Sequence, residues 1–299
     1  MDGSQKVSMI RKACILIAAL ALLAACEGRP APAFTSPLLL GGRVVDAATL
    51  EAGRAGYRRA CRPCHGDAGD GKGPLSVGQR PPPRDFTLGV FKFASVPSGA
   101  LPRDEDLVRT VKEGLRGTAM LGWHLSEPEI VRIVQFIKTL SPRWREEAAG
   151  DPVPIPPDPW AALEAQAIAV GRGVYHGLAR CNACHPSYVP RSEADAAAGA
   201  AGVAPARRED PYAPVATASD FGAPILAPDF TREEMRSVRP GNLPDLYRVI
   251  AAGVGGTAMP AWAGALSPSD LWALTRYVSS IAALRGTPET EAPRLTSTR

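Results

Sequence analysis

Apolar residues recur at intervals of three and four in two stretches of the chain, within residues 126–143 and 267–284. This spacing is typical of one face of an amphipathic α-helix. The apolar positions are Ile130, Ile133, Val134, Ile137 and Leu140 in the first stretch, and Leu271, Leu274, Val278 and Ile281 in the second. We therefore expect one packed helix near the end of each half of the chain.

Each of these stretches begins with a helix-start signal. Ser126 is followed three residues later by Glu129, which is the spacing of a capping box. In the second half Ser267 precedes Pro268, and Asp270 takes the place of the glutamate. Proline suits the first helical position because its fixed φ is helical and its missing N–H would be unpaired there. Both helices are thus predicted to start at matched points.

A second pair of helical stretches, which bear glycine and tyrosine, lies earlier in each half. They contain Gly53, Gly56 and Tyr57 in the first half, and Gly171, Gly173 and Tyr175 in the second. Glycine has no Cβ atom, so two backbones can approach closely at its position. We expect these glycines to let each helix pack closely against the amphipathic helix of the same half.

Shorter segments also recur in the same order in both halves. The pairs are Asp85-Phe86-Thr87 with Asp229-Phe230-Thr231, Leu101-Pro102 with Leu243-Pro244, Gly117-Thr118-Ala119-Met120 with Gly256-Thr257-Ala258-Met259, and Trp123 with Trp262. Leu107 precedes Met120 by 13 residues, as Leu246 precedes Met259. An internal duplication explains this order. The predicted fold class is all-α, with two helical domains in tandem.

The start of the chain is typical of an export signal. Three basic residues precede an apolar stretch, Cys14 to Ala25, that is too short to span a bilayer comfortably. Leu23-Ala24-Ala25-Cys26 resembles a bacterial lipobox, which implies a signal peptide over residues 1–25 and lipid attachment at Cys26. An ordinary signal peptide and an uncleaved anchor are the alternatives. Each of the three places the body of the protein outside the cytoplasm.

The length and charge of the chain limit its organisation. With 299 residues and a formal net charge of +4, it fits two domains and lacks the basic character of a nucleic-acid-binding protein. Residues 46–143 hold 15 Lys/Arg against 11 Asp/Glu, whereas residues 160–284 hold 10 against 11. We place the domains in these two ranges. A tether at 26–45, a proline-rich linker at 144–159 and a disordered tail at 285–299 complete the chain.

All six cysteines have an assignment in this organisation. Cys14 lies in the signal and Cys26 in the lipobox, and the other four form two Cys-x-x-Cys units that are each followed by histidine. The units are Cys61-Arg62-Pro63-Cys64-His65 and Cys181-Asn182-Ala183-Cys184-His185. This is the attachment motif of c-type haem, in which two thiols form thioethers and the adjacent histidine binds the iron. No cysteine remains for a structural disulfide.

A methionine follows each unit in the repeated Gly-Thr-Ala-Met segment. A methionine thioether can complete six-coordinate haem iron and raise its potential. The candidate iron ligands are therefore His65 with Met120, and His185 with Met259.

The motifs have other interpretations. One Cys-x-x-Cys-His unit alone could be half of a zinc site or a redox-active dithiol, but two copies with matching methionines favour haem. His124 could replace Met120 in principle, and His176 lies just before the second unit. We expect both of these histidines to be solvated or hydrogen-bonded, with no role at iron.

Taken together, these residues resemble the class I cytochrome c family twice over, across residues 46–143 and 160–284. The resemblance implies a small helical bundle around a covalent haem c in each domain, and so two haems with their iron per chain. The first half departs from the family at Met120-Leu121, where the second half has the usual Met259-Pro260, and this puts the rigidity of the first loop in doubt. The second half carries an insertion at about 186–227, which we expect to be a surface loop.

Six-coordinate iron leaves no open position for a substrate, so outer-sphere electron transfer is the expected function and no catalytic residue is assigned. We expect a lipid-anchored carrier on the periplasmic side of a bacterial membrane, inner or outer. It would take single electrons from a redox donor and pass them to an acceptor, with a membrane oxidoreductase complex among the candidates. The alternatives are a dihaem peroxidase, in which one haem loses its distal ligand, and a haem subunit of a larger oxidoreductase.

Overall fold

The computed structural model describes residues 34–287, and its compact unit begins at Ser36. The predicted signal peptide, the lipidation candidate Cys26 and the last twelve positions of the predicted tail lie outside the described residues. Within residues 34–287 the regular structure is mainly helical, and its sheets are two short antiparallel pairs. The all-α prediction is confirmed.

We call residues 38–150 the first lobe and residues 151–287 the second lobe. The first lobe contains β1 (Leu38–Leu40), β2 (Arg43–Val45), α2 (Ala47–Ala60), α3 (Arg62–His65), the 3-10 turn η1 (Pro74–Ser76), α4 (Asp104–Glu113), α5 (Glu127–Lys138) and α6 (Arg143–Glu146). The second lobe contains α7 (Glu164–Gly173), a π-helical turn η2 (Val174–Leu178), a 3-10 turn η3 (Cys181–Ala183), α8 (Arg191–Ala200), β3 (Ala216–Thr217), β4 (Ile225–Leu226), α9 (Leu243–Ala252) and α10 (Pro268–Ala283).

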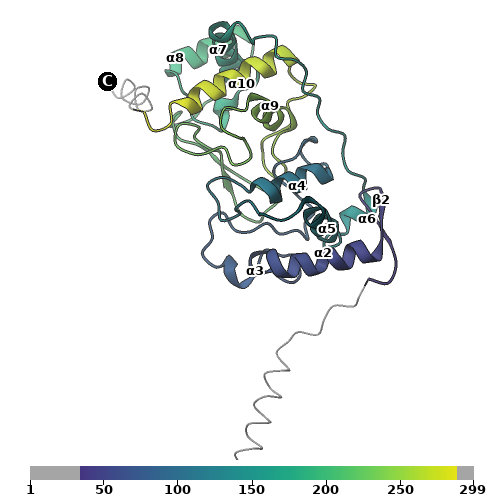
Figure 1. Cartoon of the computed structure of the whole chain (residues 1–299). Helices are drawn as coiled ribbons and strands as arrows, with labels where there is room; N and C mark the ends of the chain where they lie inside the picture. Colours follow the sequence, from purple (N-terminus) through teal and green to yellow (C-terminus); the bar gives the residue numbers. More distant parts are fainter. Residues whose placement is uncertain (1–33, 288–299) are drawn as a thin grey trace, which may run out of the picture. The chain divides into compact units, whose positions relative to one another are not determined.

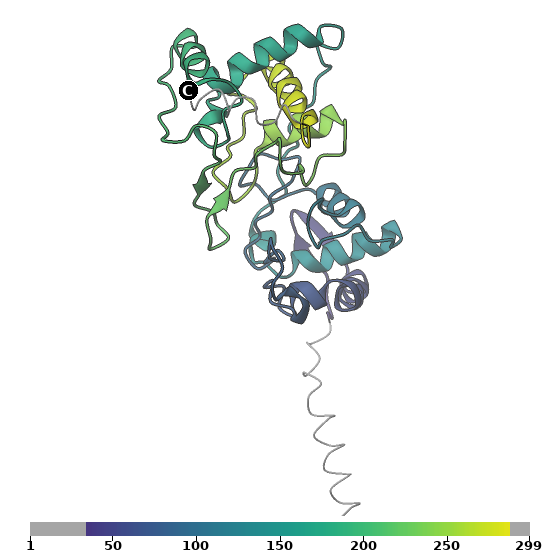
Figure 2. The same cartoon turned by 90° about the vertical axis from the view of Figure 1, so that its left-hand side faces the viewer.

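One closely packed helix pair organises each lobe: α2 with α5, and α7 with α10 (Figure 1 and Figure 2). A Cβ atom on Gly53 would lie 2.0 Å from the carbonyl oxygen of Arg132, and one on Gly171 would lie 2.0 Å from that of Ala273. These glycines are therefore required for the close approach, as predicted. A Cβ on Gly173 would meet nothing within 4 Å, so the prediction is wrong for that residue.

The predicted starts of the two amphipathic helices are confirmed. Helix α5 begins after Ser126, whose backbone N–H donates to Glu129 Oε2 at 3.2 Å. Helix α10 begins at Pro268, and Ser267 Oγ accepts from the Asp270 N–H at 3.1 Å. Glu129 thus satisfies the Ser126 N–H, and Ser267 satisfies an N–H of the first turn of α10 that has no partner within the helix.

The predicted tether and linker contain packed residues. Leu38–Val45 form a hairpin in which Leu40 is fully buried, so the tether prediction is wrong for this segment. Trp144 is buried in the first lobe and Val153 joins the core of the second, although both fall in the predicted linker. The indole N–H of Trp272 also donates to the Pro156 carbonyl at 3.0 Å. These large apolar side chains anchor a segment whose prolines suggested only a spacer.

The insertion at 186–227 is more ordered than a surface loop. It forms helix α8 and the β3–β4 hairpin, and α8 packs on η2 through the buried Ala194 and Ala198. The surface-loop prediction is wrong because alanine at a spacing of four builds one apolar helix face, which the segment buries.

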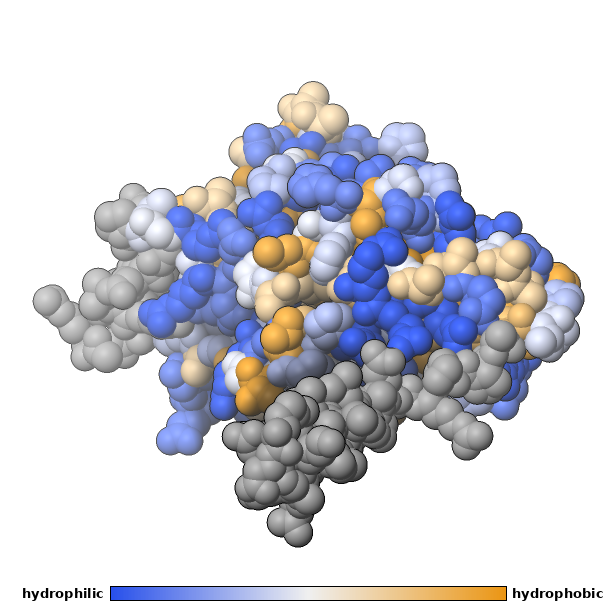
Figure 3. Space-filling view, turned by 60° about the horizontal axis from the view of Figure 1, so that its bottom comes forward, coloured by the Kyte–Doolittle hydropathy of each residue, from blue (hydrophilic) through white to orange (hydrophobic). Residues whose placement is uncertain are grey.

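The surface facing the viewer in Figure 3 carries small groups of hydrophobic residues among hydrophilic ones. Exposed apolar side chains include Val44, Val77 and Leu121. None of the helices in residues 34–287 combines the length and apolar character needed to cross a bilayer.

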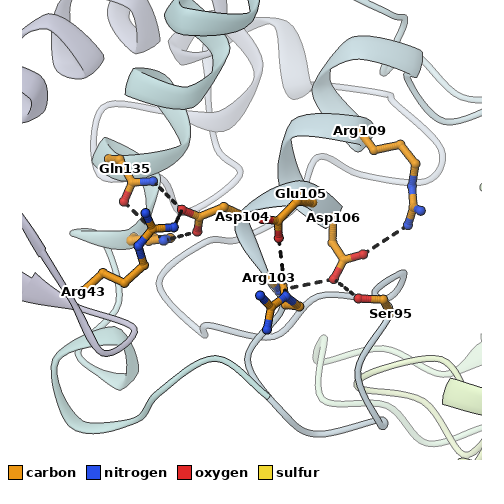
Figure 4. Close-up of polar contacts among 9 residues, drawn as sticks. Arg43, Ser95, Arg103, Asp104, Glu105, Asp106, Arg109 and Gln135 are labelled. Carbon is orange, nitrogen blue, oxygen red and sulfur yellow. Dashed lines mark hydrogen bonds and ion pairs between the residues drawn. The ribbon is translucent and has the colours of Figure 1, made fainter. Parts of the chain in front are cut away.

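Helix α4 is tied to α5 and to the hairpin through Asp104 (Figure 4). The Asp104 carboxylate accepts from Gln135 Nε2 at 2.8 Å and also from Lys138 of α5, and Arg43 lies 3.5 Å away. Lys138 is almost fully buried, so its charge requires this partner. The contact fixes α4, which leads directly into the loop that carries Met120.

Helices α4 and α9 share a buried aspartate in the first turn that was not among the residues predicted from the sequence. Asp106 and Asp245 are each 2% exposed and each accept from an arginine three residues later, Arg109 at 3.2 Å and Arg248 at 2.8 Å. Asp245 is also bound by Arg239 at 2.6 Å. The repeated Asp-Leu-x-Arg at 106–109 and 245–248 is the signal that could have revealed it, since the repeated leucines are next to the aspartates.

Candidate functional site

The first Cys-x-x-Cys-His unit lies where α2 ends and the short helix α3 begins. Cys61 and Cys64 are free, half-buried thiols, and His65 is 9% exposed. His65 Nδ1 lies 2.9 Å from the carbonyl oxygen of Arg84. A carbonyl can only accept, so Nδ1 carries the proton and the lone pair lies on Nε2, which is the form that binds a metal.

The second unit repeats this arrangement at the turn η3. Cys181 and Cys184 are free thiols, and His185 is again 9% exposed. His185 Nδ1 donates to the carbonyl oxygen of Pro228 at 2.9 Å. Both histidines therefore present Nε2 as the free ring nitrogen.

The repeated Asp-Phe-Thr segments explain how each histidine ring is held. Phe86 stacks on His65 with ring centroids 4.4 Å apart, and Phe230 stacks on His185 at 4.8 Å. In each segment the aspartate accepts from the backbone N–H of the threonine, at 2.8 Å in the first and 3.0 Å in the second. This side-chain turn sets the phenylalanine and the preceding carbonyl against the histidine. The sequence shows the repeat but not this role.

Two buried tyrosines hold the chain directly after each histidine. The Tyr57 hydroxyl donates to the Gly66 carbonyl at 2.8 Å, and the Tyr175 hydroxyl donates to the Pro186 carbonyl at 2.9 Å. Burial raises the pKa of both phenols, so each remains a neutral donor. The helix that precedes each motif therefore fixes the loop that follows it.

Burial keeps one thiol of each unit protonated. It raises the pKa of Cys61 to about 12, with a smaller contribution from Cys64, and that of Cys181 to about 12. A redox-active dithiol needs a nucleophilic thiol with a lowered pKa. This electrostatic environment disfavours the dithiol interpretation. In the described part of the chain, no three His, Cys, Asp or Glu residues form a metal-binding group.

The two methionine loops have the same hydrogen bonds. The Met120 carbonyl accepts from the Leu115 N–H at 2.7 Å, and the Met259 carbonyl from the Val254 N–H at 3.2 Å. Thr118 Oγ1 accepts from the Met120 N–H at 3.1 Å, and Thr257 Oγ1 from the Met259 N–H at 3.2 Å. Where the second loop has proline, the Leu121 N–H donates to the Ala119 carbonyl at 3.0 Å. The first loop therefore has the geometry of the second without proline.

A cavity of about 1150 Å³ in the second lobe brings together four predicted site residues: Cys181, Cys184, His185 and Met259. Its apolar wall comes from α9 and α10 and includes Leu246, Ile250, Leu274 and Val278. Two thiols, an imidazole with a free Nε2 and a thioether around one apolar cavity are the donor set that a covalent haem requires. The residues present fit that group.

In the first lobe, Cys61, Cys64 and His65 lie on α3 and its N-terminal boundary, and Met120 lies in the loop after α4. The matching hydrogen bonds of the histidine, tyrosine and methionine loop, and the matching stack of phenylalanine on histidine, carry the comparison with the second lobe.

The other two histidines are placed as expected. His124 is exposed, and the buried His176 donates from Nδ1 to the Arg172 carbonyl at 3.0 Å. Burial lowers the pKa of His176 to about 4, so it is neutral at pH 7. Neither lies on the wall of the second-lobe cavity.

The family described as cytochrome c oxidase, cbb3-type, subunit III matches the chain in two segments, residues 48–137 and 166–278, which together exceed half of its length. The chain belongs to this family. It is therefore a c-type cytochrome with a function in haem-based electron transfer. Each matched segment includes one Cys-x-x-Cys-His unit and one methionine loop.

A solved structure is also similar to this cytochrome. It is a chain of the Kuenenia stuttgartiensis reducing HAO-like protein complex, with 33% sequence identity and a TM-score of 0.60. The similarity covers 77% of this chain and 96% of that one. No curated protein matches the sequence significantly.

Proposed function

We propose that this cytochrome holds two covalent haems, one in each lobe, and relays single electrons between a redox donor and an acceptor. The proposed attachment sites are Cys61 with Cys64 and Cys181 with Cys184. The proposed iron ligands are His65 with Met120 and His185 with Met259. The observation that carries the proposal is the set of equivalent hydrogen bonds around both histidines and both methionine loops.

A c-type haem supplies an iron that takes up and releases one electron. The chain's contribution is to orient each imidazole through its Nδ1 bond, to hold each thioether in a braced loop and to exclude water with apolar walls. A methionine ligand raises the potential, and a six-coordinate iron has no position for a substrate. This ligand set supports a carrier.

A peroxidase would need one ligand that dissociates, and Met120, which lacks the proline that follows Met259, is the weaker candidate of the two methionines. The Met120 loop, however, has the same bonds as the Met259 loop and an additional one from the Leu121 N–H. This equivalence favours the carrier over the peroxidase.

A second candidate function is that of an electron-transfer subunit in a larger oxidoreductase. Two observations favour it: the family is described as an oxidase subunit, and the similar solved chain belongs to a protein complex. Purification of the native protein from its membrane in mild detergent distinguishes the subunit from the independent carrier. A stoichiometric partner in the same fraction supports the subunit, and a single polypeptide supports the independent carrier.

We further propose that lipid at Cys26 anchors the protein on the periplasmic side of a bacterial membrane, on the basis of the lipobox resemblance. Replacement of Cys26 by serine should release the protein from the membrane fraction into the soluble periplasmic fraction. Mass spectrometry of the N-terminal peptide should show lipid in the natural protein only. Unchanged fractionation and an unmodified Cys26 would contradict the anchor.

The main test is the covalent haem content of the full chain, matured in a host that attaches c-type haem. We expect two haems in the natural protein. We expect one haem in the C61S/C64S variant and one in the matched C181S/C184S variant. Absence of covalent haem from the natural protein would overturn the proposal.

A redox titration followed in the visible spectrum tests the ligands. Two low-spin haems at the high potentials typical of His/Met iron support a carrier. A high-spin haem that reacts with peroxide would instead support the enzyme.

A further inference from the structure

The wall of the second-lobe cavity contains residues of the first lobe. The segment from Arg80 to Asp85, together with Leu88, Lys92 and Phe93, lines it beside the second-lobe cysteines. Two backbone hydrogen bonds join the lobes nearby: Gly255 N–H donates to the Lys92 carbonyl, and Arg116 N–H donates to the Arg236 carbonyl, both at 3.0 Å. The first lobe is thus a structural part of the second site.

Two cations from the first lobe gather on one aromatic ring at this wall. The guanidinium carbon of Arg84 lies 3.6 Å from the centroid of Phe221, and Lys92 Nζ lies 5.2 Å from it. Phe221 comes from the second-lobe insertion and also lines the cavity. A cation over an aromatic face is attracted to it, so the ring gathers the two charges at one place.

The same wall carries more positive than negative charge. Its basic residues are Lys72, Arg80, Arg84, Lys92, Arg180 and Arg236. Its acidic residues are Asp70, Asp85, Glu233 and Glu234. Glu234 is already paired with Arg116 and Arg285, and Asp85 accepts from Thr87. The wall therefore has cations left over for a ligand.

Three half-buried cations of this group form no ion pair with a carboxylate of residues 34–287. They are Arg84, Lys92 and Arg236. Asp85 attracts Arg84 electrostatically, although no ion pair joins the two side chains. Burial, then repulsion from Arg84 and Arg236, lowers the pKa of Lys92 to about 8. Clustered, partly desolvated cations are unfavourable unless anionic groups join them.

We infer that Arg84 and Lys92 of the first lobe, together with Arg236 of the second, bind the two propionate carboxylates of the second-lobe haem. This inference rests on the proposed function, which places a haem in that cavity. Arg84 then serves both sites, because its carbonyl orients His65 and its guanidinium faces the second cavity. The second haem is held by both lobes, and its potential depends on charges of the first.

The test is a redox titration of the haem-loaded full chain carrying Lys92→Gln or Arg84→Gln. Positive charge close to a haem favours the reduced state, so each variant should lower the potential of the second-lobe haem. We expect a tenfold change in the reduction equilibrium, which is about 59 mV for one electron. The first-lobe haem should keep its potential in Lys92→Gln, whereas Arg84→Gln can shift both potentials because Arg84 also lies beside His65. The C61S/C64S variant, which retains only the second haem, assigns the two potentials.

Two variants serve as controls. Arg207→Gln removes one positive charge from the second lobe, but neither Arg207 nor its partner Asp195 lies on the cavity wall, and it should leave both potentials unchanged. Lys92→Arg keeps the charge and should restore the natural potential.

A free anion such as inorganic phosphate could occupy the same cations, and phosphate titration at constant ionic strength distinguishes it. A potential of the natural protein that is indifferent to phosphate supports propionates. A potential that falls with phosphate, and no longer does so in Lys92→Gln, would overturn the inference. Two intact haems with unchanged potentials in both Lys92→Gln and Arg84→Gln would also overturn it, while the proposed function would stand. Missing haem in the natural protein would instead refute the proposed function.

Discussion

The two lobes satisfy the carbonyl groups of their Cys-x-x-Cys-His units with different donors. In the first lobe, backbone N–H groups of a glycine-rich loop donate: Gly73 to Cys64 at 3.1 Å and Gly71 to His65 at 2.9 Å. In the second lobe the donors come from the insertion.

There the Val215 N–H donates to the Cys184 carbonyl at 2.8 Å, and Arg208 Nη1 donates to the His185 carbonyl at 2.7 Å. Arg208 also donates to the Asn182 carbonyl at 2.7 Å. The duplicated motif imposes one requirement, because buried carbonyls need donors. A long insertion meets it as well as a tight glycine loop does, so the insertion is a structural part of the second site.

The largest expected effect tests what the lobes share. Gly53→Ala and Gly171→Ala should each destabilise the protein by about 3 kcal/mol, because the new methyl group would overlap a carbonyl oxygen of the partner helix. Thermal unfolding of the haem-loaded protein measures this loss of stability.

Gly173→Ala is the matched control, since open space surrounds that position. It should stabilise the protein by roughly 0.5–1 kcal/mol through helix propensity. Equal effects of Gly171→Ala and Gly173→Ala would show that the helices do not pack as described.

The next effect tests what the lobes do not share. Arg208→Gln should destabilise the second lobe by about 2 kcal/mol, because two carbonyls lose a charged donor. The neighbouring Arg207→Gln removes only an exposed ion pair with Asp195 and should change stability by less than about 1 kcal/mol. Denaturant unfolding compares the two variants. Equal stability of both would mean that the insertion does not support the motif.

Acid should destabilise the second lobe through His176, which follows Tyr175. In the first lobe the residue after the equivalent Tyr57 is the exposed Arg58. Burial lowers the folded pKa of His176 to about 4, so below pH 6.5 the unfolded chain binds the extra proton. Stability is therefore lost as pH falls from 6.5 towards 4, at about 1.4 kcal/mol per pH unit.

His176→Gln should reduce this slope in unfolding experiments between pH 7 and 4.5. An identical slope in the variant and the natural protein would exclude His176 as its source.

The smallest effect returns to a shared feature. Phe86→Leu and Phe230→Leu should each cost about 1 kcal/mol, since both lose a stacked contact with the histidine of their lobe. The variants should have similar unfolding midpoints. A large difference between them would show that the lobes hold their histidines by unequal means.

Much of the site could be predicted because its chemistry is local. The spacing of Cys61, Cys64 and His65 is a property of five consecutive residues, and the helix starts at Ser126 and Ser267 depend on side chains three positions apart. The roles of Phe86 and Phe230 were beyond reach, because a repeat shows that a residue matters without showing what it touches. Alanines of the insertion were misjudged because their burial depends on η2, a partner distant from α8 in the chain.

The sequence by itself determined the helical class, the duplication, the two motifs and the two methionines, because covalent spacing and helical periodicity act over a few residues. The tertiary structure alone decided which donors satisfy each motif and which charges surround the second cavity. Arg208 reaches His185 across 23 positions, and Arg84 and Lys92 line a cavity that belongs to the other lobe. Such contacts form only when distant segments are packed together, and no local pattern records them.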